Sequence, residues 1–323
     1  MNVQEELLRT AIDPSLTVDN LSQISQKAFG SSVRANGYDV LTGGCWNRVI
    51  SVRHDSRDDL VFKISPEIGN SGLEREFHVL RYFSEHTSLP VPEPLHFDLS
   101  GNIVRGSLLV MRKIPGHVMH QVYGYLDTEA RNNITTQIAR YVSELHHSKA
   151  TRFGGIEKTD LERLESWSDF WIPRFDRAME QVRSGNYIAT NKIDEIDVIR
   201  PSFRSLLDIG PDSTATHYDI WSGNVMIDME VSPPRVSGFI DIPGFFADYA
   251  REISFMLMFG LADRAFFDVY TANHHLDPEF WIRVHIYNLK MHLKHITMYP
   301  TESYYRQGAD ECLSVIKKQL GKN

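Results

Sequence analysis

Two polar segments separated by a predicted β-hairpin constrain this chain more than any other feature. The first runs from His217 to Asn224 and precedes the hairpin, and the second begins at the carboxylate of Asp241, directly after the hairpin. Apolar residues 225–227 and 236–240 flank a polar stretch with two prolines, which is the pattern of two strands joined by a turn. In an antiparallel hairpin the start of the first strand lies beside the end of the second. We therefore expect Asn224 and Asp241 to approach each other.

The spacing within the first segment indicates phosphoryl transfer. Asp219 lies two residues after His217, and Asn224 lies five residues after Asp219. This is the spacing of the kinase catalytic loop, in which the Asp is the base and the Asn binds metal. Asn224 and Asp241 would offer two hard oxygen ligands, which suit Mg²⁺ because phosphates and waters complete its octahedron. The alternative is a polar turn followed by an Asp that merely ends a strand.

A positive group for the nucleotide phosphates is expected at Lys63. Alternation along residues 60–64 places Lys63 on the face opposite the apolar side chains. A helix with apolar residues at spacings of four and three follows, and it carries Glu74 and Glu76. A carboxylate behind the lysine would fix its flexible ammonium over the phosphates, and we select Glu76 for this role.

The phosphate-covering loop is expected at Gly43 and Gly44, which lie between two apolar runs. Backbone amides in such a turn can face phosphate oxygens, although the GxGxxG pattern is absent. A plain hairpin turn explains the two glycines equally well.

These segments together resemble the aminoglycoside phosphotransferase superfamily and, within it, the fructosamine (ketosamine) kinases. The resemblance covers most of the chain. It extends to residues 241–248, which look like the family's metal-binding Asp segment, and to residues 257–270, which look like its next helix pair. Near the end, the similarity to fructosamine kinases in particular is carried by Tyr287, Leu289, Leu293, His295 and Tyr304.

The resemblance implies an α+β, bilobal, protein-kinase-like fold. We expect a small β-rich nucleotide-binding lobe at residues 1–114 and a larger, mostly helical lobe at residues 115–323 that holds the catalytic loop and the acceptor site. ATP and Mg²⁺ are the implied cofactors. The implied reaction is transfer of the γ-phosphate to a hydroxyl of a small, amine-bearing sugar or polyol.

The resemblance also assigns roles to individual residues. Asp219 would be the catalytic base, Asn224 and Asp241 the metal ligands, Lys63 the phosphate contact and Glu76 its partner. The interlobe hinge, which would contact the nucleotide, is expected at Met111, Arg112, Lys113 and Ile114. For the acceptor we expect contacts from Trp221, Asp248, Glu252 and Tyr304, with structural alternatives for each of them.

Several alternatives remain open from the sequence. One departure from the family is Tyr218, because its members usually have Gly between the His and the Asp. The segment 110–116 resembles the hinge of the antibiotic kinases more than that of the ketosamine kinases, so an aminoglycoside or other antibiotic acceptor stays an alternative. A nucleotide-binding pseudokinase is the alternative of another class, and the complete set of catalytic residues speaks against it. A protein substrate is disfavoured because no Ala-Pro-Glu motif follows Asp241.

Composition agrees with a cytoplasmic enzyme. The 323 residues are 42% hydrophobic and 24% charged, enough for a large core in two lobes. The net charge of −8 disfavours nucleic-acid binding, and no apolar run of membrane-spanning length is present. The first residues lack the pattern of a secretion signal, and the two cysteines are too few for a disulfide framework. His285, His292 and His295 lie near one helical face, but an apolar stripe beside them favours core packing over a metal site.

Overall fold

A computed structural model gives the fold, and it describes residues 13–30, 32–41, 47–55 and 58–322. The chain divides into two compact units. Unit 1 comprises residues 1–117, 226–230 and 237–242, and unit 2 comprises residues 118–225, 231–236 and 243–323. Each unit is described separately below.

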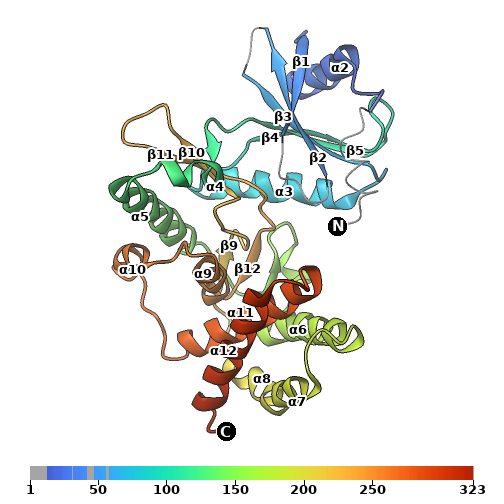
Figure 1. The fold of residues 1–323 in the computed structure, drawn as a ribbon. Coiled ribbons are helices and arrows are strands. Elements are labelled where there is room, and N and C mark those ends of the chain that lie inside the picture. Colours follow the sequence, from blue (N-terminus) through green and yellow to red (C-terminus); the bar gives the residue numbers. More distant parts are fainter. Residues whose placement is uncertain (1–12, 31, 42–46, 56–57, 323) are drawn as a thin grey trace. The chain divides into compact units, whose positions relative to one another are not determined.

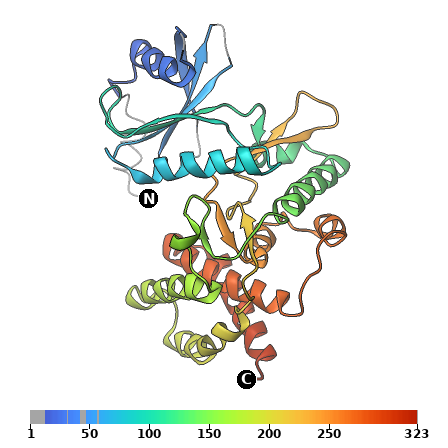
Figure 2. The same cartoon turned by 180° about the vertical axis from the view of Figure 1, so that it is seen from behind.

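Unit 1 is built on a five-stranded antiparallel sheet with the strand order β1-β2-β3-β5-β4. Helix α3 packs against β4 and β5 and runs along the sheet in both views (Figure 1 and Figure 2), while α2 packs against β1 and β4. The elements are α2 (Val18–Phe29), β1 (Ala35–Leu41), β2 (Arg48–His54), β3 (Leu60–Ser65), α3 (Ser71–His86), β4 (Pro94–Asp98) and β5 (Ser107–Arg112).

The predicted alternation along β3 is confirmed. Leu60, Phe62 and Ile64 are at most 4% exposed and belong to the core cluster beneath the sheet. Lys63 lies on the opposite face, where its register partners are Val49 of β2 and Leu109 of β5. Burial of the three apolar side chains therefore fixes the direction of the lysine.

Helix α3 follows β3 directly and has the predicted amphipathic character. Asn70 caps it, because its side-chain oxygen accepts a hydrogen bond from the backbone N–H of Gly72. Leu73, Leu80 and Phe83 are buried against the sheet. The same burial determines which of the acidic residues on α3 faces Lys63.

Unit 2 is mostly helical. Its helices are α4 (Met119–Val122), α5 (Thr128–Leu145), α6 (Trp167–Ser184), α7 (Thr190–Ile199), α8 (Phe203–Leu206), α9 (Tyr249–Met258), α10 (Arg264–Tyr270), α11 (Phe280–Met298) and α12 (Ser303–Gln319), with 3₁₀ turns at η1 (Tyr123–Tyr125), η2 (Asp160–Glu162) and η3 (Arg200–Ser202). A four-stranded sheet has the order β7-β9-β12-β8, formed by β7 (Lys149–Ala150), β8 (Gly154–Gly155), β9 (Ser213–Thr216) and β12 (Phe245–Ala247). Helix α5 buries an apolar stripe, since Ile134, Ile138, Val142 and Leu145 are at most 1% exposed.

A second small sheet contains the strands of the predicted hairpin. Its order is β11-β10-β6, with β6 at His117–Val118, β10 at Val225–Asp228 and β11 at Arg235–Phe239. The two predicted strands are therefore formed and are hydrogen-bonded neighbours. Among the helices that the structure describes, none combines the length and the apolar character needed to cross a membrane.

Candidate functional site

The candidate site has one group of residues in each unit. Lys63, Glu76 and Asp241 belong to unit 1, whereas Asp219 and Asn224 belong to unit 2. The predicted approach of Asn224 to Asp241 stays a prediction.

In unit 1, Lys63 contacts two carboxylates. Its ammonium donates to Oε1 of Glu76 at 2.8 Å and to Oδ1 of Asp241 at 2.6 Å. Burial by itself would lower the pKa of Lys63, but the carboxylates of Glu76 and Asp241 outweigh it, so the pKa is raised. The lysine is therefore a fixed positive charge on the sheet.

Glu76 is the acidic residue of α3 that pairs with Lys63. Its side chain is 16% exposed, and burial raises its pKa against the opposing effect of Lys63. Asp241 differs from Glu76 because its side chain is 50% exposed. Asp241 also has a φ of 55°, a left-handed conformation that is uncommon outside glycine and is enriched at functional sites.

Of the predicted hinge residues, Met111 and Arg112 end strand β5 of the same sheet, and Lys113 and Ile114 follow it. Met111 pairs with Val61 of β3, and Val61 lies two residues before Lys63 on the same strand. The neighbouring basic side chains are tied to nearby carboxylates: Arg112 donates to Glu93 at 2.7 Å, and Lys113 lies 3.2 Å from Asp59. Gly43 and Gly44 lie outside the described residues.

In unit 2, the side chain of Asn224 is hydrogen-bonded to Asp219. Its amide nitrogen donates to the backbone carbonyl of Asp219 and to the carboxylate oxygen Oδ2, both at 2.9 Å. Asn224 is 5% exposed, and its backbone N–H donates to the carbonyl of Trp221 at 2.8 Å. The loop thus holds the candidate base and the candidate metal ligand in one hydrogen-bonded unit.

Glu252 supports this loop from α9. Its carboxylate accepts hydrogen bonds from the backbone N–H groups of His217, at 2.9 Å, and Tyr218, at 3.0 Å. It is 1% exposed and lies 3.5 Å from Nε2 of His146, a buried histidine whose pKa is lowered chiefly by desolvation. These contacts favour a positioning role for Glu252 over the predicted contact with the acceptor.

Asp248 likewise lies in a buried network. It is 0% exposed, and it caps α9 by accepting from the backbone N–H of Ala250 at 3.0 Å. Its Oδ2 accepts from Arg283 at 2.7 Å and from the hydroxyl of Tyr287 at 2.5 Å. Arg283 in turn pairs with Asp277. The contacts with Arg283 and Tyr287 join the start of α9 to α11, so a structural role is favoured for Asp248 too.

Tyr218 has a φ of 79°, a left-handed conformation that glycine adopts without strain. A bulky residue is strained in this conformation. The Tyr218 ring lies between Phe245, with centroids 4.5 Å apart, and the guanidinium carbon of Arg251, 4.2 Å away. No pattern in the sequence singles out Arg251, because its contacts depend on this packing.

Trp221 and Tyr304 lie in an aromatic region of unit 2. Trp221 is partly buried and packs against the cluster of Phe255, Met258 and Met291. Tyr304 is 56% exposed, and its hydroxyl donates to the carbonyl of Met258 at 3.1 Å. Both aromatic residues therefore remain candidates for acceptor contact.

Each of the two candidate ligands offers an oxygen donor of the kind that Mg²⁺ prefers. Because the Asn224 nitrogen is used by Asp219, the amide oxygen is the group that Asn224 can offer to a cation. Asp241 offers a partly exposed carboxylate. Within the ranges described above, no group of three or more His, Cys, Asp or Glu side chains could hold a metal, including at His285, His292 and His295. A metal held by only two protein groups, with phosphates and waters, is the arrangement that Mg²⁺ adopts at nucleotide sites.

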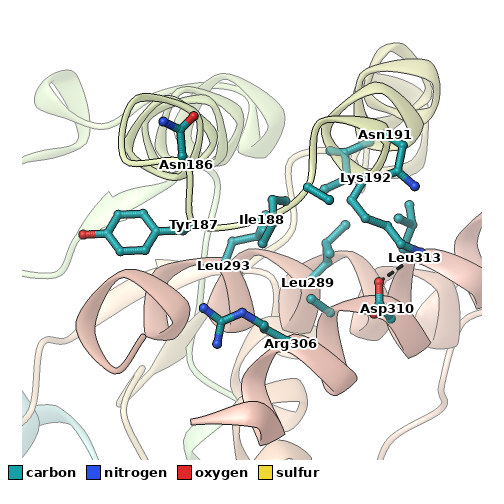
Figure 3. A pocket seen from close by; sticks show the side chains of 13 residues that line it. Asn186, Tyr187, Ile188, Asn191, Lys192, Leu289, Leu293, Arg306, Asp310 and Leu313 are labelled. Carbon is teal, nitrogen blue, oxygen red and sulfur yellow. Dashed lines mark ion pairs between the residues drawn. The ribbon is translucent and has the colours of Figure 1, made fainter. Parts of the chain in front are cut away.

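A separate cavity of about 550 Å³ lies elsewhere in unit 2. Figure 3 shows it between residues 186–192 and the helices α11 and α12, with Lys192 and Asp310 paired at 3.1 Å. None of the predicted site residues lines it.

Comparisons with known proteins identify the family of the chain. The fructosamine kinase family profile matches residues 17–319. A protein of Enterococcus faecium that is provisionally named a ketoamine kinase is 23% identical over 290 residues, which cover 86% of this chain and 95% of the relative.

Solved structures share the fold. A structure from Thermobifida fusca, provisionally named a fructosamine-3-kinase, has a TM-score of 0.72 at 14% identity and covers 94% of this chain and 100% of its own. The ADP-bound aminoglycoside phosphotransferase APH(2'')-Ib has a TM-score of 0.62 at 14% identity, with coverage of 92% and 97%. The protein-kinase-like fold expected from the sequence is thus confirmed, and the chain belongs to the fructosamine kinase family of nucleotide-dependent phosphotransferases.

Proposed function

We propose that this protein transfers the γ-phosphate of ATP, with Mg²⁺, to a hydroxyl of a ketosamine, which is a sugar joined to an amine. The proposal rests on one observation: the side chain of Asn224 donates hydrogen bonds to both the carbonyl and the carboxylate of Asp219. This arrangement would set the proposed base beside a proposed metal ligand, as phosphoryl transfer requires. Family membership supports the ketosamine acceptor.

In the proposed reaction, Asp219 accepts the proton of the acceptor hydroxyl. The hydroxyl oxygen forms a bond to the γ-phosphorus as the bond to the β–γ bridging oxygen breaks, and ADP leaves. Asn224 and Asp241 would hold Mg²⁺, which supplies positive charge to the phosphate oxygens when it is bound.

Lys63 would contact the nucleotide phosphates, and Glu76 would keep its ammonium in place. Gly43, Gly44 and the hinge residues 111–114 are proposed nucleotide contacts, while Trp221 and Tyr304 are proposed acceptor contacts. Positioning and electrostatics would supply most of the rate acceleration. A cytoplasmic location remains a prediction from the sequence.

The test is ATP consumption with Mg²⁺ against fructosamines, ribulosamines, aminoglycosides and macrolides. Turnover of ketosamines that is lost in Asp219→Asn supports the proposal. Turnover of an antibiotic alone would replace it with the second candidate, an antibiotic phosphotransferase, which the likeness to APH(2'')-Ib motivates. Tight ATP binding with no acceptor turned over would indicate a pseudokinase.

A further inference from the structure

Arg251 of α9 is a buried charge whose hydrogen-bonding capacity is largely unused. Its side chain is 3% exposed, and its Nε and Nη1 have no hydrogen-bond partner. Nη2 reaches only the sulfur of Met291 at 3.7 Å, while the rings of Tyr218 and Phe255 lie 4.2 and 5.2 Å from the guanidinium carbon. A guanidinium carries five donors, and burying it without an anion is costly.

Lys290 of α11, a helix that packs against α9, adds a second cation. Its pKa is lowered to about 7 by burial and by the charges of Arg251, Lys294 and Arg174. Across the part of the chain that the structure describes, no hydrogen bond or ion pair joins Lys290 or Arg251 to a carboxylate. The local excess of positive charge is therefore not neutralised by the protein.

Arg174 of α6 completes what we call the cationic cluster, defined as Arg174, Arg251 and Lys290. Its guanidinium carbon lies 3.6 Å from the centroid of Phe170, and it donates to the Phe170 carbonyl. Burial lowers its pKa, and Tyr218 acts in the opposite direction. Three helices thus each supply one cation.

The cluster adjoins the catalytic loop within unit 2. Arg251 faces the ring of Tyr218, the residue directly before Asp219. Met291, which contacts Arg251, belongs to the same apolar cluster as Trp221. An acceptor whose hydroxyl reaches Asp219 would therefore have the cluster close by.

We propose that the acceptor carries an anionic group, a carboxylate or a phosphate, that the cationic cluster binds. The inference rests on the proposed function and narrows its substrate class. A ketosamine formed from an amino acid carries a carboxylate, and one formed from a sugar phosphate carries a phosphate. Guanidinium groups bind both of these planar or tetrahedral anions through paired hydrogen bonds. The cluster would repel a polycationic aminoglycoside.

Matched acceptor pairs test the proposal. One arm compares fructosylglycine with fructosylglycinamide, and the other compares N-methylfructosamine 6-phosphate with N-methylfructosamine. In at least one arm, kcat/KM of the wild-type protein should be about tenfold or more higher for the anionic member, as expected for a charge-assisted contact. The arm that shows the preference identifies the anion.

Substitutions at Lys290 and Lys294 test whether the preference for anionic acceptors arises at the cationic cluster. Lys290→Met should reduce the ratio of kcat/KM between anionic and neutral acceptors to about twofold or less. Lys294→Met is the matched control, because Lys294 lies one turn further along α11 and is exposed; it should keep most of the preference. No preference in either arm, or an equal loss in the two variants, would overturn the inference. Arg251→Gln serves in its place if Lys290→Met does not fold.

Binding measurements distinguish a failure of the proposed anion site from a failure of the proposed function. Titration calorimetry of the ADP-loaded protein with the same acceptors should show tighter binding of the anionic member, lost in Lys290→Met. If no ketosamine is turned over, the proposed function fails, and the calorimetry alone decides the anion site. Neutral and anionic acceptors could instead be turned over with equal efficiency and bound with equal affinity. That result would disprove the anion site but not the proposed function.

Discussion

The carboxylate of Glu252 accepts a hydrogen bond from the backbone N–H of His217 at 2.9 Å, across 35 residues of sequence. It thereby joins α9 to the start of the candidate catalytic loop, residues 217–224. The next backbone N–H, that of Tyr218, donates to the other carboxylate oxygen at 3.0 Å. One buried side chain thus sets the path of the backbone immediately before Asp219.

Replacing Glu252 should disturb both folding and catalysis. Glu252→Gln leaves one acceptor oxygen and places an NH₂ group where a backbone N–H donates, so the free energy of unfolding should fall by about 1–3 kcal/mol. Urea unfolding measures this loss. The value of kcat should fall by a larger factor than the nucleotide affinity. The substitution displaces the loop that carries Asp219 but leaves the nucleotide contacts in place. Glu302→Gln, at an exposed residue, is the control. A variant with wild-type kcat would contradict the positioning role.

Loss of the candidate base should abolish turnover selectively. Asp219→Asn removes the proton acceptor but keeps a carbonyl oxygen that can accept from Asn224, so kcat should fall by about a hundredfold to ten-thousandfold. Nucleotide affinity, measured by calorimetry, should stay near that of the wild type. The exposed Asp208→Asn is a matched control. Near-normal turnover in Asp219→Asn would disprove the base assignment.

The pairing of Lys63 with Glu76 predicts different effects for the two acidic residues of α3. Glu76→Gln removes the charge that lies 2.8 Å from the Lys63 ammonium, so KM for ATP should rise by about tenfold. Glu74→Gln changes the same residue type two positions away and should have little effect. Steady-state kinetics at varied ATP concentration compares them. Equal effects would show that overall charge, and not the ion pair, matters.

The free energy of unfolding should depend on pH through Lys290. Its folded pKa of about 7 lies below its ordinary value of 10.5. Between these values the unfolded chain binds the proton more tightly than the folded chain, so this residue makes stability rise with pH. The contribution has an upper limit of about 1.4 kcal/mol per pH unit.

Urea unfolding at pH 7 and pH 9 tests this linkage. The wild type should gain stability over this interval relative to Lys290→Met, which has no ammonium to lose. Lys294→Met should keep most of the wild-type pH dependence, because burial is the largest cause of the lowered pKa of Lys290 and the charge of Lys294 is a smaller one. Parallel pH profiles for the wild type and Lys290→Met would refute the lowered pKa.

The sequence alone determined those parts of the site that depend on local periodicity and on order along the chain. Alternation along β3 placed Lys63 opposite a buried apolar face, because successive side chains of a strand point to opposite sides. The helical spacing on α3 identified the acidic residues able to meet it. Likewise, the short separation of Asp219 and Asn224 allowed one loop to bring them together.

Only the tertiary structure decided what the buried polar residues of α9 do. Asp248 and Glu252 were expected near the acceptor because they follow Asp241 closely, yet their carboxylates lie in networks with Arg283 and with the backbone at His217. The surroundings of Arg251, in which Nε and Nη1 have no hydrogen-bond partner, also depend on the packing of α9 against α11 and Tyr218. Sequence spacing carries no information about such contacts, since partners distant along the chain are selected by burial and by the need to satisfy charge in the interior.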